Sequence, residues 1–78
     1  MTSKEIYTKM RIEATKGFAY YIGFISKKKY NLIKKEVENF KEIADLDFDL
    51  GVLEFRSYQK EITKYNLMIK SLETAEIM

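Results

Sequence analysis

Apolar residues recur every three or four positions over residues 52 to 72, in the longest regular pattern of the chain. They are Val52, Phe55, Tyr58, Ile62, Tyr65, Ile69 and Leu72, with no Gly or Pro between them. This spacing lays one apolar stripe along one helix. We predict a helix from about Leu50 to Glu73, roughly 36 Å long at ~1.5 Å per residue. That length favours an elongated helical hairpin or bundle, because helices in globular proteins average ~11–12 residues.

A second apolar stripe precedes it, with the same helical spacing. Its members are Tyr30, Ile33, Val37, Phe40 and Ala44, and Leu32 and Ile43 widen it. We predict that this helix ends near residues 44 to 46. Asp45, Asp47 and Asp49 follow, and short acidic side chains favour helix N-termini. Asp47 or Asp49 is therefore the predicted N-cap of the long C-terminal helix.

The N-terminus predicts a third helix. Thr2 and Glu5 have the spacing of a capping box, so the helix should begin near Ser3. Its inward face would be formed by Ile6, Met10, Ala14, Phe18, Tyr21 or Ile22, and Ile25. Lys27, Lys28 and Lys29 suit the negative pole at a helix end. We therefore expect a turn or kink near residues 26 to 31.

Residues 17 to 25 leave an alternative open. The segment is aromatic and β-branched and carries Gly17 and Gly23, which also fits a short buried strand. We favour helix, because a lone strand would need a partner and only residues 50 to 57 offer one. The alternative is a small α+β fold with strands near 17–25 and 50–57.

These patterns together predict an all-α fold, with an N-terminal helix and a long antiparallel helical hairpin whose two stripes face each other. The 78 residues form one domain, 1–78. A chain of this size buries only roughly 60–65% of its unfolded surface. Because the core is thin, we expect a symmetric homodimer to complete it.

Composition argues against catalysis. The chain has no His and no Cys, so the commonest general base, metal ligand and strong nucleophile are missing. The run Asp45-x-Asp47-x-Asp49-x-Gly51 is similar to the start of an EF-hand loop, but its glycine comes one place late and Arg56 takes the closing position. We predict no enzyme activity, no cofactor, no metal site and no small-molecule substrate.

Targeting features are also missing from the sequence. The first residues lack the positive head, apolar middle and cleavage site of a signal peptide. The longest mostly apolar run, residues 17 to 25, is shorter than the ~20 residues of a spanning helix. We expect no membrane span and a cytoplasmic location.

Charge is unevenly distributed. Residues 27 to 41 contain six lysines and two glutamates, whereas residues 42 to 54 contain five acidic residues and no base. Helical spacing places the lysines on one face, which could track nucleic-acid phosphates. The candidate nucleic-acid face consists of Lys27, Lys28, Lys34, Lys35, Lys41, Arg56, Lys60 and Lys64.

Six tyrosines are too many for so small a core, so some should reach the surface, where tyrosine often anchors protein interfaces. The candidate protein interface consists of Tyr20, Tyr21, Phe24, Tyr58 and Tyr65. We predict a small non-enzymatic regulatory protein that binds another protein or itself through an aromatic-rich helical surface. The alternatives are a nucleic-acid-binding protein, and an inhibitor of a nucleic-acid enzyme whose acidic residues 42 to 54 imitate phosphates.

Overall fold

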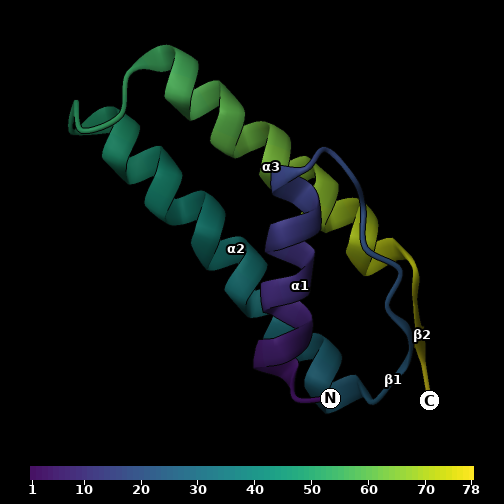
Figure 1. Ribbon diagram of the computed structural model, residues 1–78. Coiled ribbons are helices and arrows are strands. Elements are labelled where there is room, and N and C mark those ends of the chain that lie inside the picture. Colours follow the sequence, from purple (N-terminus) through teal and green to yellow (C-terminus); the bar gives the residue numbers. More distant parts are fainter.

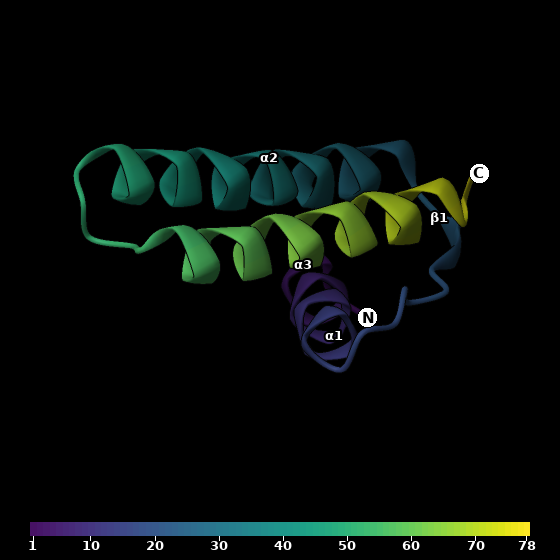
Figure 2. The same cartoon turned by 90° about the horizontal axis from the view of Figure 1, so that it is seen from above.

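The computed structural model describes all residues from 1 to 78 as three helices and two short strands (Figure 1). They are α1 (Ser3–Thr15), β1 (Gly23–Ile25), α2 (Lys27–Asp49), α3 (Phe55–Glu73) and β2 (Ala75–Ile77). Helices α2 and α3 run side by side as an antiparallel hairpin, and α1 crosses one face of it (Figures 1 and 2). The fold is mostly helical, as predicted, but the three helices are accompanied by a small two-stranded parallel sheet. None of the three helices has the length and apolar character needed to cross a bilayer.

Helix α1 begins where the capping box predicts. The backbone N–H of Glu5 donates to the Thr2 hydroxyl at 3.1 Å, and the backbone N–H of Thr2 donates to the Glu5 carboxylate at 3.3 Å. Hydrogen bonds from the Thr2 backbone and then its hydroxyl lower the pKa of Glu5, since they favour the charged carboxylate.

Helix α1 ends at Thr15, so the predicted continuation through residues 17 to 25 is wrong. Gly17 has a φ of +92° and forms a Schellman motif, in which the Gly17 N–H donates to the Ala14 carbonyl and the Phe18 N–H to the Glu13 carbonyl. The left-handed conformation of Gly17 turns the chain out of the helix. The following residues then run along the end of α3.

Strand β1 confirms part of the α+β alternative, but its partner differs from the predicted one. It pairs in parallel with β2, with Phe24 opposite Glu76. Residues 50 to 57, the predicted partner, instead form the turn after α2 and the start of α3. Two hydrogen bonds fasten the chain before β1 to α3 and its C-cap, since the Tyr20 N–H donates to the Ser71 hydroxyl and the Ile22 N–H to the Thr74 hydroxyl.

Helix α2 begins with the three lysines that were predicted to end a helix. Ser26 is its N-cap and accepts a hydrogen bond from the Lys29 N–H at 3.2 Å. A serine cap contributes about 1 kcal/mol. The unfavourable dipole interaction of exposed cations is weaker and is screened by solvent. The cap therefore decides where the helix starts.

Helix α2 ends at Asp49, later than predicted, through a second Schellman motif. Gly51 has a φ of +76°, its N–H donates to the Phe48 carbonyl, and the Val52 N–H donates to the Asp47 carbonyl. The next helix, α3, starts at Phe55 and has Glu54 as N-cap without a side-chain bond. The prediction of Asp47 or Asp49 as its N-cap is therefore wrong, because both lie within α2.

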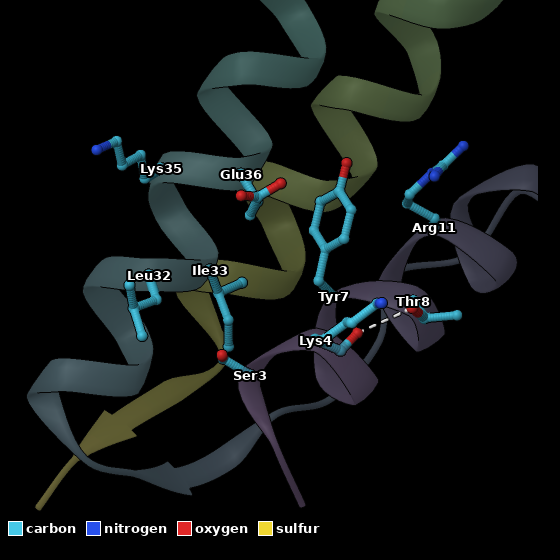
Figure 3. A pocket seen from close by; sticks show the side chains of 9 residues that line it. All are labelled: Ser3, Lys4, Tyr7, Thr8, Arg11, Leu32, Ile33, Lys35 and Glu36. Atoms are coloured by element: carbon cyan, nitrogen blue, oxygen red, sulfur yellow. Dashed lines mark hydrogen bonds between the residues drawn. The ribbon is translucent and has the colours of Figure 1, made fainter.

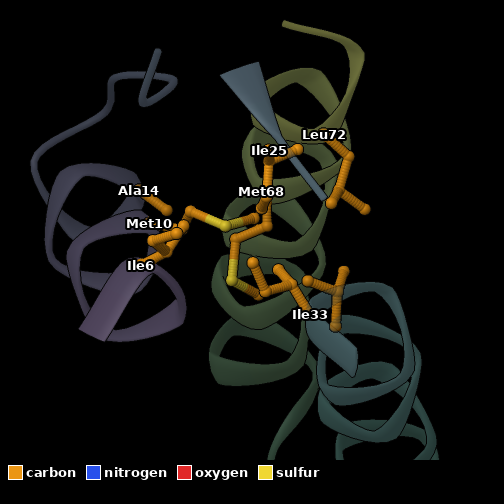
Figure 4. Close-up of a cluster of buried hydrophobic side chains, with 8 residues drawn as sticks. Ile6, Met10, Ala14, Ile25, Ile33, Met68 and Leu72 are labelled. Carbon is orange, nitrogen blue, oxygen red and sulfur yellow. The ribbon is translucent and has the colours of Figure 1, made fainter. Parts of the chain in front are cut away.

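The core lies where α1 crosses the hairpin (Figure 4). Its buried residues are Ile6, Met10, Ala14, Ile25, Ile33, Val37, Met68 and Leu72. The predicted inward faces of α1 and α2 are confirmed over these positions. The α3 stripe is only partly correct, because Met68 and Ser71 are fully buried while Phe55 is 62% exposed. Helix α1 and the chain before β1 together cover Met68 and Ser71. Neither of them covers the start of α3.

Candidate functional site

The groove between α1 and α2 is one candidate for a binding site (Figure 3). It encloses about 410 Å³. Its lining residues are Ser3, Lys4, Tyr7, Thr8, Arg11, Leu32, Ile33, Lys35 and Glu36. Figure 3 shows the charged end of Lys35 pointing away from the groove, while Tyr7 and Glu36 lie between the helices. The Arg11 guanidinium lies 5.8 Å from the centre of the Tyr7 ring.

Tyr7 lies between the two helices of this groove. Partial burial raises the pKa of its hydroxyl, and nearby Arg11 opposes this rise. The phenol therefore stays protonated at neutral pH, where its hydroxyl can donate or accept a hydrogen bond. The carboxylate of Glu36 lines the same groove and also raises this pKa.

A polar cluster joins α2 to α3 near the turn that connects them. The Tyr58 hydroxyl donates to the Asp45 carboxylate at 2.5 Å, and the Lys41 ammonium donates to it at 2.7 Å. Phe48 stacks on the Tyr58 ring with a centroid distance of 4.4 Å. The bonds from Lys41 and then Tyr58 lower the pKa of Asp45, whereas the same carboxylate raises the pKa of Lys41 and of Tyr58. These contacts hold α2 and α3 together near the turn.

The predicted aromatic interface is not one patch. Tyr21 and Phe24 are exposed beside and within β1, whereas Tyr20 and Tyr65 pack against the core. Tyr58 is held in the cluster with Asp45 at the other end of α3. Of these five residues, the structure therefore brings only Tyr21 and Phe24 prominently to the surface.

The predicted basic face divides into separate groups. Lys27, Lys28, Lys34 and Lys35 are exposed along the first half of α2, and none of them forms an ion pair. Arg56 and Lys60 lie at the start of α3, which the antiparallel hairpin places far from the start of α2. Lys41 pairs with Asp45, and Lys64 pairs with Glu61 at 3.3 Å.

Acidic residues gather at the end of the hairpin that carries the 50–54 turn, which we call the turn end. All five acidic residues of the 42 to 54 segment belong to the last turns of α2 or to the loop that follows. They form no cluster of three or more groups that could hold a metal ion. The opposite end, which carries β1 and β2, is called the strand end.

The turn end also exposes apolar side chains on the face of the hairpin that α1 crosses. Figure 2 shows α1 beneath only part of the hairpin, with nothing beneath the turn end. A hollow of about 320 Å³ lies there, bounded by Tyr7 and Arg11 of α1. Its hairpin residues, which we call the shelf, are Asn39, Phe40, Ile43, Ala44, Asp47, Leu53 and Glu61.

Further apolar residues of the turn end are exposed, although the sequence did not predict them as surface residues. Each is more than half exposed: Leu46, Leu50, Val52 and Phe55. Ile43 on the shelf is itself 52% exposed. The sequence contains a pattern that could have indicated this exposure. Ile43, Leu46 and Leu50 follow helical spacing on a face of α2 that does not point at α3.

Comparison with models of protein families, with characterised proteins and with solved structures gives no match to this chain. The function of this chain is therefore inferred from its residues and their arrangement.

Proposed function

We propose that this chain is a small protein-binding module without catalytic activity, and that it works by burying the shelf and the apolar side chains around it. The observation that carries this proposal is the hollow beside α1 at the turn end, where Phe40, Ile43 and Leu53 line a part of the hairpin that α1 leaves uncovered. Single exposed apolar residues are ordinary, but a contiguous patch marks an interaction surface in soluble proteins.

The exposed area supports the proposal. A monomer of 9.3 kDa should expose about 5,000 Å² by the scaling of folded proteins. This chain exposes 5506 Å², and only 11 of its 78 residues are buried. The excess arises because the hairpin, in a molecule 41 Å long and 17 Å thick, extends beyond the helix that covers it. A partner at the turn end would reduce this excess.

The turn end is also held in a defined shape. The Asp47 carbonyl accepts bonds from the Val52 and Leu53 N–H groups, and the Asp45 carboxylate joins α2 to Tyr58 of α3. A surface that is ordered before binding loses less conformational entropy when a partner docks. This favours a binding role for the turn end over a role as a loose loop.

A site-specific crosslinking experiment tests the proposal. A photoreactive amino acid at position 43 or 46, introduced in the cells that express the protein, should form a covalent product with another polypeptide, whereas the same group at Phe24 should not. Position 24 is a matched control, because it is exposed but lies at the strand end. Products at position 24 with none at 43 or 46 would contradict the proposal.

Nucleic-acid binding is the second candidate, and the unpaired lysines at the start of α2 favour it. Lys28, Lys34 and Lys35 are exposed and free to contact phosphates. If this candidate is correct, changing all three to Glu abolishes salt-sensitive binding to mixed-sequence duplex DNA and leaves the circular dichroism spectrum unchanged. Binding that survives the triple change would eliminate these lysines as the contact surface.

A further inference from the structure

We infer that α2 pairs with α2 of a second copy of this chain, antiparallel, through the side of the helix that is turned away from α3. This side is called the outer face of α2. The inference rests on the proposed function, because Ile43 and Leu46 belong to the apolar residues proposed there to bind a protein. The result is a two-fold dimer in which the same contact occurs twice.

An apolar seam without a partner in the chain runs along the outer face. Its residues are Leu32, Asn39, Ile43 and Leu46, and all four side chains are exposed. Steps of seven, four and three residues are the spacing of a seam between two packed helices. Figure 2 shows α2 along one edge of the molecule, with α3 and α1 both on the same side of it. The seam is therefore open to a helix from another chain.

A row of four charged residues borders this seam. Lys28, Lys35, Glu42 and Asp49 follow one another at intervals of seven residues, so they lie along one side of the helix. All four are exposed, and none of them forms an ion pair. The row is basic in the first half of α2 and acidic in the second half.

These charges select a second copy and its orientation. When two α2 helices run antiparallel with their middles together, Lys28 faces Asp49 of the second copy and Lys35 faces Glu42. The two-fold symmetry repeats both pairs. A parallel arrangement in register sets each charge beside its own like. A shift of seven residues sets Lys35 against Lys35 or Glu42 against Glu42, so the charges favour one orientation and one register.

The other border of the seam, towards α1, agrees with the same register. It carries Lys29, Glu36 and Asp47. The antiparallel arrangement brings Lys29 close to Asp47 of the second copy. It also brings the Glu36 carboxylate close to the Asn39 amide, which can donate hydrogen bonds to it. Neither border therefore places like charges directly opposite each other.

The seam residues pack in this register as well. Leu32 lies beside Ile43 of the second copy at both ends of the contact, and the two Asn39 side chains lie near the two-fold axis. A polar residue at one seam position fixes the register of paired helices at some cost in stability. The contact is therefore apolar towards its ends and specific at its centre.

The size of the contact predicts a weak dimer. Helix α2 has 23 residues, or about 34 Å at ~1.5 Å per residue, in a molecule 41 Å long. One helix from each copy supplies the contact, which places it among small interfaces that bury less than about 1,200 Å² in total. We expect a Kd of roughly 10–500 μM.

Sedimentation velocity of the full chain at about 0.15 M NaCl, with concentrations up to about 1 mM, tests this inference. The wild-type chain should reach a dimer. Lys35→Glu and Glu42→Lys should each raise the dimer Kd at least about 10-fold, because each sets like charges together twice. Lys34→Glu and Glu38→Lys are the matched controls, since both residues are exposed and lie outside the row. They should leave the Kd within about 2-fold.

Mixing the two variants provides a sharper readout. In the dimer of Lys35→Glu with Glu42→Lys, both contacts between positions 35 and 42 join opposite charges. The mixture should therefore form dimers at concentrations where each variant alone is monomeric. A chain that carries both changes should dimerise like the wild type. Circular dichroism of each variant verifies folding.

A disulfide test is independent of these charges. The chain has no cysteine, so Asn39→Cys introduces one thiol near the two-fold axis. Mild oxidation should link two copies. Leu32→Cys lies on the same seam and should not link, because the antiparallel arrangement separates the two thiols by roughly 20 Å along the helices. A parallel pair would link both variants.

Several results would overturn the inference and remain distinguishable from failure of the proposed function. These are a chain that stays monomeric at every concentration, a mixture that associates no better than its components, and linkage of Leu32→Cys. If position 43 or 46 then crosslinks to a different polypeptide, the protein-binding function stands and only the second copy is wrong. If neither position forms a product, both proposals fail.

Discussion

Asp45 links the two helices of the hairpin through one half-buried carboxylate. It accepts bonds from Lys41 one turn earlier in α2 and from Tyr58 of α3. Its pKa is lowered by these bonds, first by the one from Lys41. A carboxyl group with a lowered folded-state pKa stabilises the fold above its unfolded pKa, and this contribution is lost as the pH falls through the folded value.

The pH dependence of stability should therefore carry the signature of Asp45. As the pH falls below about 4, the wild-type chain should lose stability, and Asp45→Asn should lose less, because the amide cannot be protonated in this range. Urea unfolding near pH 7 and near pH 3 measures the difference. Equal losses in the two proteins would mean that the cluster does not form in solution.

Met68 and Phe55 provide a second test. The apolar periodicity of α3 predicts that Phe55 is buried and Met68 is not, whereas the structure shows the reverse. The stripe contains Phe55 and omits Met68, but Met68 is fully buried and Phe55 is 62% exposed. Met68→Ala should lower the free energy of unfolding by about 2–5 kcal/mol. Phe55→Ala should lower it by less than about 1 kcal/mol. Chemical denaturation of both variants measures the order, and a larger loss for Phe55→Ala would contradict the packing described.

At the scale of elements, two glycines decide where helices end. Gly17 and Gly51 each take a positive φ in a Schellman motif. At Gly17 this motif ends a helix that the apolar pattern would continue. The three lysines that begin α2 show the same kind of competition, since the Ser26 cap outweighs their unfavourable position. Boundaries in this chain follow hydrogen bonds at helix ends more closely than they follow charge.

Gly17→Ala should lower the free energy of unfolding by about 1–2 kcal/mol, the cost of a left-handed conformation for a residue with a Cβ atom. No atom lies within 4 Å of the added methyl group, so a steric clash does not contribute. Gly17→Asn is the matched control and should cost less, because Asn tolerates this conformation. Thermal unfolding of both variants tests the order of the two losses.

At the scale of the whole molecule, the separation of charge is the dominant feature. The basic N-terminal part and the acidic turn end lie in different regions of an elongated body. Association that brings these two charged regions together should weaken as salt is raised, because exposed charges are screened. Sedimentation at about 0.05 M and about 0.5 M NaCl measures this change. Association that strengthens with salt would indicate a contact made by the apolar residues alone.

Local patterns were sufficient to predict much of this architecture. The capping box at Thr2 placed the start of α1, and the three-four spacing of Ile33, Val37 and Ala44 identified the buried face of α2. The candidate site was less predictable. Ile43 was recognised only as part of a stripe, because its exposure depends on how far α1 reaches along the hairpin.

The sequence by itself determined the presence of three helices, the buried face of α2 and the separation of basic from acidic regions, since each depends on residues a few positions apart. Only the tertiary structure decided that Gly23–Ile25 pairs with Ala75–Ile77 and that α1 covers Met68 but not the shelf. Those contacts join residues about fifty positions apart, and no local period encodes them. Their formation depends on packing and hydrogen bonding across the whole chain, which overrides local propensity.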